Sequence, residues 1–160
     1  TPEQIKAVTA RIIEMGDKKE SVTREDLPYI VNDVLKHTPQ VEKVRLASYM
    51  VNKTYGLRPV AQVRLEVNGE LYEESASGDG QYDAFVRCIR HIYKDKLKRE
   101  FPWLTNYQVG IPPGGRTDAL VQTIITWNYH DRIFHTRGLD GDQTEAAIKA
   151  TIKMLNLIEK

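Results

Sequence analysis

Cysteine is almost absent: Cys88 is the one cysteine among 160 residues, so no disulfide can form within the chain. It lies between Val86 and Ile89 in a helical pattern, and we interpret it as a small buried hydrophobic side chain. The 4 histidines have no His or Cys partner at a spacing that holds a metal, such as i and i+4 on a helix. The sequence therefore predicts neither a disulfide framework nor a zinc or iron site.

An excess of charge of one sign and long apolar runs are also missing. The chain has 23 Lys and Arg against 22 Asp and Glu, a formal net charge of +1. This balance gives no electrostatic reason to expect a nucleic acid or an anionic membrane as a partner. No apolar run approaches the roughly 20 residues that span a bilayer, and the first residues lack the basic and apolar stretches of a signal peptide. We therefore expect a cytoplasmic protein with no membrane partner.

The basic run at 94–99 raises the alternative of nucleic-acid binding, because a helix beside a three-stranded sheet resembles double-stranded RNA-binding domains. It is one short run on a neutral chain, and the helix macrodipole alone favours basic residues near a helix C-terminus. We expect no nucleic-acid partner.

Familiar catalytic and nucleotide-binding motifs do not occur. Residues 78–80 (Gly-Asp-Gly) lack the third glycine of the Rossmann pattern, and residues 114–117 (Gly-Gly-Arg-Thr) lack the Walker spacing and its lysine. No nucleophile elbow is found. We therefore expect no catalysis within this chain and no cofactor bound to it.

The sequence does contain one structural plan used twice. Each copy has an alternating apolar strand, a short turn, a returning strand, a Gly/Asp cluster and an Ala-rich helix, and 62 residues separate Ala84 from Ala146. Few residues are identical, so the repeat rests on hydropathy and turn residues. Two such copies would bring two helix N-termini into related positions, where backbone N–H groups can hold an anion.

The first 38 residues are predicted to be a helical pair. A capping box over residues 1–4, with Thr at the N-cap and Pro at the first helical position, opens a helix that Gly16 ends. A second start signal at 23–26 opens a helix that stops at 38–39 (Thr-Pro). Because the chain is helical from its beginning and does not start with Met, we expect a fragment of a longer protein.

From Val41 the hydrophobic period changes to two, which indicates half-buried strands. The Asn-Gly at 68–69 predicts a tight hairpin between strands at 60–67 and 70–77, and a helix follows from 81 to about 99. The residues expected to point inward are Val44, Leu46, Ser48 and Met50 on the first strand, and Phe85, Ile89, Ile92 and Tyr93 on the helix.

The second copy follows the same order, with strands at 106–111, 120–129 and 133–136 and a helix from Gln143. Each copy is thus a βββα unit. Two units related by an internal pseudo-repeat predict a single α+β domain, in which a helix covers one face of each antiparallel sheet. The outer strands need neighbours or protection, so we expect a homodimer.

The Gly/Asp cluster before the first of these helices is the strongest candidate for a binding site. Glycine in a turn and aspartate as a helix cap offer a purely structural alternative. Free N–H groups, the Asp83 carboxylate and an apolar wall would together suit an apolar amino acid, with its α-carboxylate on the N–H groups and its ammonium on Asp83 or a carbonyl. The expected site residues are Gly78, Asp79, Gly80, Tyr82, Asp83, Leu104, Tyr107, Ile111 and Val121.

Five short stretches carry a family resemblance, in matching order: residues 75–80 (Ser-Ala-Ser-Gly-Asp-Gly), 83–84 (Asp-Ala), 115–120 (Gly-Arg-Thr-Asp-Ala-Leu), 136–138 (Thr-Arg-Gly) and 142–143 (Asp-Gln). They resemble the C-terminal regulatory domain of the 2-isopropylmalate synthase and citramalate synthase family, over about residues 41–160. The resemblance implies a pair of βββα units that dimerises, binds the end-product amino acid at the dimer interface and inhibits a separate catalytic TIM barrel.

The same resemblance implies that residues 1–38 are a helical linker subdomain and residues 39–160 an amino-acid-binding regulatory domain. The barrel of the parent enzyme would condense acetyl-CoA with a 2-keto acid, an acyl transfer that uses a divalent metal. None of its metal-binding motif occurs in this sequence. No activity is therefore expected from this chain alone.

The implied effector is leucine or isoleucine, the end products of branched-chain amino-acid biosynthesis. Leucine-responsive members often carry Pro where this chain has Gln81, and a small aliphatic residue where it has Tyr82. The pair of Tyr82 and Asp83, with Gln143 and the apolar residues named above, looks more like the isoleucine-responsive citramalate type. A dimerisation module with no functional effector site is the alternative.

Overall fold

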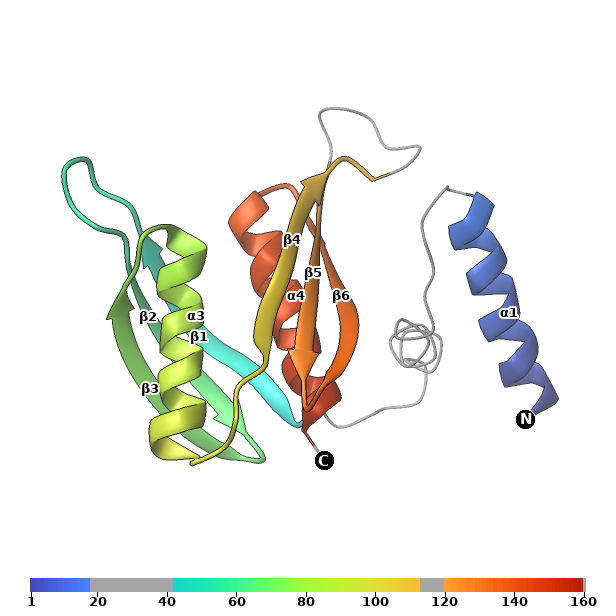
Figure 1. Cartoon of the computed structure of the whole chain (residues 1–160), viewed down its shortest axis with the longest axis horizontal. Helices are drawn as coiled ribbons and strands as arrows, with labels where there is room; N and C mark the ends of the chain where they lie inside the picture. The colour runs from blue at the N-terminus through green and yellow to red at the C-terminus, as the bar shows by residue number, and fades with distance from the viewer. Residues whose placement is uncertain (18–41, 113–119, 160) are drawn as a thin grey trace.

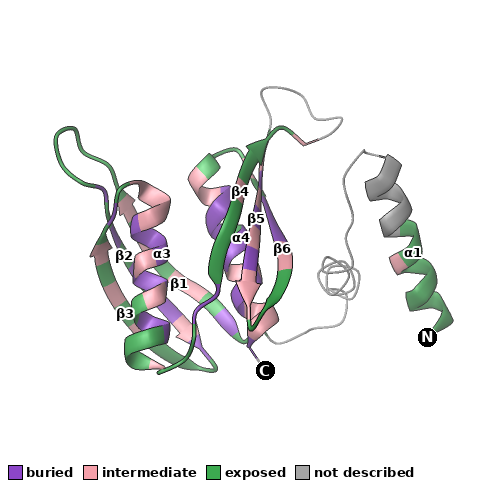
Figure 2. Cartoon of the chain, viewed as in Figure 1, coloured by how far each residue is buried: buried purple, intermediate pink, exposed green. Residues whose placement is uncertain are grey.

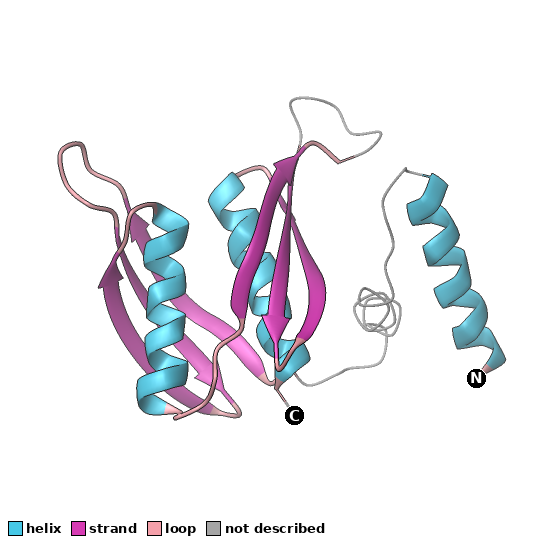
Figure 3. Ribbon diagram, viewed as in Figure 1, coloured by secondary structure: helices cyan, strands magenta, loops and turns pink. Residues whose placement is uncertain are grey.

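The computed structural model describes residues 1–17, 42–112 and 120–159, and it has the expected α+β architecture (Figures 1 and 3). Helix α1 (Pro2–Asp17) comes first. Two βββα units follow, which confirms the fold class predicted from the repeat. The helix predicted from residues 23–26 onward lies outside the described residues, and the boundary at residue 38 stays a prediction.

The capping box at the start of α1 forms as expected. The Gln4 backbone N–H donates to Thr1 Oγ1 over 3.3 Å, and the Thr1 amino group donates to Gln4 Oε1 over 3.2 Å. These reciprocal bonds satisfy N-terminal donors of the helix. The helix ends at Asp17, one residue past the predicted Gly16.

The first unit is an antiparallel sheet in the order β1 (Val44–Asn52), β2 (Val60–Val67) and β3 (Glu70–Ser77). Asn68 and Gly69 join β2 to β3 with φ of 51° and 87°. Two positive φ angles are what a two-residue type I′ hairpin requires, so the predicted turn is confirmed.

The expected inward face of β1 is wrong in its second half. A β-bulge falls between Leu46, which pairs with Leu65, and Ser48, which pairs with Arg64. One extra residue reverses the alternation of a strand. Tyr49 and Val51 are therefore partly buried and packed on the core, whereas Ser48 is exposed and Met50 is 49% exposed.

The second unit repeats this register in β4 (Trp103–Gly110), β5 (Val121–Tyr129) and β6 (Arg132–Asp140). Its bulge falls between Leu104 and Asn106, and Leu104 pairs with Trp127, 62 residues after Leu65. The second hairpin turn, at residues 130–131, again has positive φ angles, of 52° and 61°. The pseudo-repeat therefore extends to the bulge and the turn.

A helix closes each unit. Helix α3 (Gln81–His91) continues as the π-helix η3 (Ile92–Lys96), and α4 spans Gln143–Ile158. The first helix thus ends before the predicted residue 99, because Lys98 adopts a left-handed φ of 55°. The predicted inward residues of this helix are all buried: Phe85, Ile89, Ile92 and Tyr93.

One core joins the two units. Helix α3 packs on β2 and β3, and α4 packs on β5 and β6 (Figure 1). Phe101 links the units, with its ring centroid 5.9 Å from Tyr93 and 6.4 Å from Trp127. Cys88 is buried in this core, and burial raises the pKa of its thiol to about 11, which confirms its interpretation as a small hydrophobic side chain. No described helix is long and apolar enough to cross a membrane.

Candidate functional site

The starts of α3 and α4, which the repeat placed in related positions, lie side by side. Thr144 Oγ1 donates to Gln81 Oε1 over 3.3 Å. The two starts differ in their caps: the Asp142 carboxylate accepts from the Glu145 N–H over 3.0 Å, whereas α3 begins at Gly80, which provides no side-chain cap. The first turn of α3 therefore presents backbone N–H groups that no side chain caps, which is the arrangement that favours an anion.

Gly78 lets the end of β3 approach α3 closely. A Cβ on Gly78 would lie 2.7 Å from Asp83 Oδ2 and 2.8 Å from Ala84 Cα. A Cβ on Gly138 would likewise lie 2.8 Å from the carbonyl carbon of Ala146, the repeat equivalent of Ala84. Close packing thus accounts for Gly78 without a ligand, although not through the positive φ of a turn, which among the described glycines only Gly56 and Gly69 adopt.

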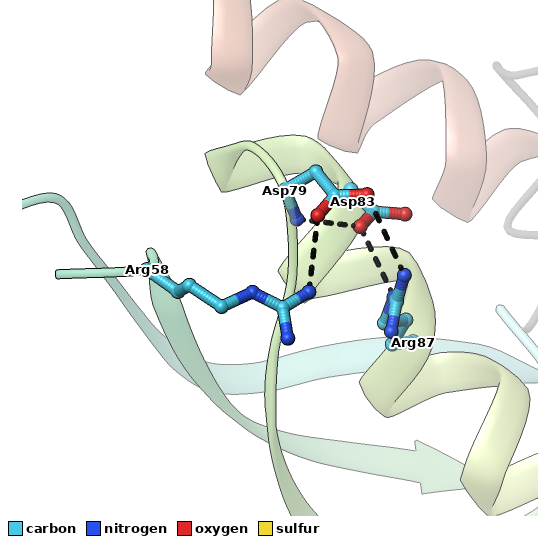
Figure 4. A network of polar contacts seen from close by, with 4 residues as sticks. All are labelled: Arg58, Asp79, Asp83 and Arg87. Atoms are coloured by element: carbon cyan, nitrogen blue, oxygen red, sulfur yellow. Dashed lines mark hydrogen bonds and ion pairs between the residues drawn. The ribbon is translucent and has the colours of Figure 1, made fainter.

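Asp79 and Asp83 lie between two arginines at the start of α3 (Figure 4). Asp83 Oδ2 accepts from the Asp79 N–H over 2.8 Å and from Arg87 Nε over 3.0 Å. Arg58 donates to Asp79 Oδ1 over 3.1 Å. The bonds from the Asp79 N–H and from Arg87 fix the Asp83 carboxylate. Both bonds end on Oδ2, and Asp83 Oδ1 has no hydrogen-bond partner among the described residues.

Tyr82 and Tyr107 form the aromatic part of the site, with ring centroids 5.4 Å apart. The Tyr82 hydroxyl lies 2.6 Å from Thr151 Oγ1. Burial raises the pKa of Tyr82, and it also raises the pKa of Tyr107, where a hydrogen bond with Gln143 partly opposes the rise. The structure therefore brings Tyr82, Tyr107 and Gln143 together from α3, β4 and α4.

The predicted apolar residues lie on one face of the second sheet. In the antiparallel register, Tyr107 pairs with Ile125 and Gly110 with Gln122, so Ile111 and Val121 are on the same face as Tyr107. Leu104 is also on this face, but beyond the bulge and farther from the helix starts. We refer to Leu104, Tyr107, Val109 and Ile111 as the β4 stripe.

The β4 stripe is more exposed than its repeat equivalent. Helix α4 covers β5 and β6, and Leu104, Val109 and Ile111 are 38%, 41% and 53% exposed. Figure 2 shows β4 exposed along most of its length beside β5, whose residues are intermediate or buried. On β1, the equivalents of Leu104, Tyr107 and Val109 are Leu46, Tyr49 and Val51, which are all partly buried.

The equivalent position in the first unit is closed. Tyr49 corresponds to Tyr107, because their partners Val63 and Ile125 are 62 residues apart. The Tyr49 hydroxyl donates to the Glu145 carboxylate at the start of α4. Burial, followed by this bond, raises the pKa of Tyr49. The duplicated fold therefore has one closed and one open version of the same place.

Three residues at the site were missed in the sequence. Arg87 follows Asp83 by four positions, a spacing that favours an ion pair on a helix and could have identified it. Thr151 is a polar residue on the buried face of α4, which is also a readable signal. Arg58 gives no such signal. Among the described residues, no group of three or more His, Cys, Asp or Glu could hold a metal ion.

The model of the LeuA allosteric (dimerisation) domain family matches residues 21–159. The chain belongs to this family. It is therefore a regulatory and dimerisation domain of the kind that LeuA-family synthases carry.

Three relatives that carry the names of synthases are similar to this chain. A protein provisionally named (R)-citramalate synthase CimA, of Archaeoglobus fulgidus, is 34% identical over 158 residues, which are 99% of this chain and 31% of the relative. The 2-isopropylmalate synthase of Methanocaldococcus jannaschii is 31% identical over 157 residues, 98% of this chain and 29% of the relative. That of Blochmanniella pennsylvanica is 33% identical over 146 residues, 91% of this chain and 27% of the relative. The chain spans less than a third of the length of these curated relatives.

Proposed function

We propose that this domain binds leucine or isoleucine and so mediates feedback inhibition of a 2-isopropylmalate or citramalate synthase in branched-chain amino-acid biosynthesis. The observation that carries the proposal is the difference between the two repeats. The β4 stripe is open beside an uncapped helix start, whereas its counterpart on β1 is closed by Tyr49 and Glu145. An apolar surface next to free N–H groups suits an amino acid with an aliphatic side chain.

Each part of the effector has a proposed partner. The N–H groups of the first turn of α3, at Gly80 to Asp83, hold the α-carboxylate, and Asp83 Oδ1 accepts from the ammonium. The aliphatic side chain lies on Tyr107, Ile111 and Val121. Gln143, beside Tyr107, borders the site from α4.

Isoleucine is placed ahead of leucine as the effector. The reason is Tyr82, a large ring at a position where the leucine-responsive type has a small aliphatic residue. The two ligands differ in where one methyl group branches, so their affinities should differ by about 1–3 kcal/mol.

The synthase activity itself belongs to the parent enzyme. We propose a cytoplasmic acyltransferase whose catalytic barrel uses acetyl-CoA, a 2-keto acid and a divalent metal, and which this domain inhibits as a homodimer. The dimerisation family supports the homodimer. Light scattering at micromolar concentration should return twice 18.4 kDa, and the monomer mass would contradict this.

Thermal-shift measurements against the twenty amino acids test effector binding. A ligand that binds only the folded state raises the midpoint temperature of unfolding. At a ligand concentration of a hundred times its Kd, the added free energy of unfolding is about 2.7 kcal/mol. We expect a shift with L-isoleucine or L-leucine and none with D-isoleucine, which has the same apolar surface. No shift with any amino acid would favour a dimerisation module without a functional effector site.

A further inference from the structure

The hydrogen bond between Tyr82 and Thr151 has a defined direction. Thr151 is fully buried on α4, and its hydroxyl donates to the Ala147 carbonyl oxygen over 2.8 Å. A threonine hydroxyl has one proton, so at 2.6 Å Thr151 Oγ1 must accept the proton of the Tyr82 hydroxyl. The Tyr82 hydroxyl is thus the first donor in a short chain that ends on the α4 backbone.

This bond fixes the Tyr82 ring between two other rings. The ring stacks on Phe85 of its own helix, with centroids 6.4 Å apart and an interplanar angle of 24°. Its other neighbour is Tyr107, with centroids 5.4 Å apart. A ring held by its hydroxyl and by two neighbours has little freedom to move aside for a ligand.

We propose that Thr151 is a positioning residue of the effector site, which fixes the Tyr82 ring and thereby sets which branched side chain fits against the β4 stripe. The inference rests on the proposed function, because it concerns the selectivity of that same site. Thr151 itself does not touch the ligand in this proposal and acts on it only by holding Tyr82. It also links the site on α3 to the helix of the other unit.

Replacing the hydroxyl by a methyl group tests the proposal. Thr151→Val keeps the shape of the side chain and leaves the Tyr82 hydroxyl buried without its acceptor. We expect about tenfold weaker binding of the preferred amino acid and a changed ratio of the isoleucine and leucine affinities in calorimetry. Thr151→Ser restores the acceptor and should return both affinities to within about twofold.

A double-mutant cycle assigns the effect to this hydrogen bond. Tyr82→Phe removes the donor, so adding Thr151→Val to Tyr82→Phe should change the affinity little. Fully additive losses in the double variant would mean that Thr151 acts by another route and would overturn the proposal.

Thr136→Val is the matched structural control. Thr136 is buried in the same unit, and its Oγ1 accepts from Trp127 Nε1 over 2.9 Å. Thr136→Val should lower the unfolding midpoint about as much as Thr151→Val does, while the affinity ratio stays unchanged. If the wild-type domain binds no amino acid, the proposed function and this inference both fail. If it binds, and Thr151→Val keeps the wild-type ratio as Thr136→Val does, only the inference fails.

Discussion

Gly78 and Gly80 are close in the sequence, but they differ in how much space surrounds them. A Cβ on Gly78 would collide with the backbone of α3, whereas a Cβ on Gly80 would meet no atom within 4 Å. We expect Gly78→Ala to lower the free energy of unfolding by about 1–3 kcal/mol and Gly80→Ala by less than about 1 kcal/mol. Urea unfolding measures both changes, and equal losses would show that close packing does not distinguish the two positions.

Asp83 combines a structural bond with a proposed ligand contact. Asp83→Asn keeps an oxygen that can accept from the Asp79 N–H, but it removes the charge that would hold the ammonium. A lost charge-assisted bond costs about 1.5–3 kcal/mol, so calorimetry should show isoleucine binding about ten- to a hundredfold more weakly. The control is Asp95→Asn, an exposed carboxylate on η3. Equal affinities of the two variants would place the ammonium on a carbonyl instead.

At the scale of elements, Glu159 ties the end of α4 to the first unit. Its side chain is 4% exposed, pairs with Arg99 and accepts from Asn68 Nδ2 over 2.8 Å. Glu159→Ala removes the acceptor of Asn68 Nδ2 and the partner of Arg99, whose side chain is 45% exposed, and we expect a loss of about 1–3 kcal/mol in unfolding free energy. Glu70→Ala, which removes an exposed bond to the Tyr72 hydroxyl, should cost less than about 1 kcal/mol. Similar midpoints in thermal unfolding would mean that the bonds of Glu159 contribute little.

The elements that local residues determine were predictable. Asn68 and Gly69 supply the positive φ angles of their hairpin, so the turn and both flanking strands could be placed. The bulge in β1 could not be predicted from the sequence, because it depends on how Leu46 and Ser48 pair with β2. The π-helical end of the first helix also lacks a sequence signal, since basic residues near a helix end fit an α-helix equally well.

At the scale of the whole molecule, the sequence indicated which residues form an apolar wall but not which of them stay exposed. Tyr107, Ile111 and Val121 could be named as parts of one apolar wall near the start of the first helix. The exposure of the β4 stripe, however, follows from the packing of α4 on β5 and β6, a contact between distant segments that hydropathy does not specify. The Tyr82–Thr151 bond escaped prediction for the same reason.

The closed counterpart on β1 predicts how many ligands one chain binds. Tyr49 donates to Glu145, and Asp142 caps α4, so both the apolar and the N–H part of that place are occupied. We expect calorimetry to give one isoleucine per chain. A stoichiometry near two would mean that the Tyr49–Glu145 bond opens readily and that both repeats bind.

The packing of α4 on β1 has a consequence for how the chain folds. Asn156 bonds to both backbone groups of Val44, across a sequence separation of 112 residues. Strand β1 pairs with β2 inside the first unit, but these two backbone groups of Val44 find their partner only when the last helix of the second unit arrives. Although each unit looks like a module, half of the repeat expressed alone would expose the edge of β1, and long-range closures of this kind slow folding. We therefore expect the two copies to fold and unfold together in a single cooperative step, which coincident transitions by two spectroscopic probes would check.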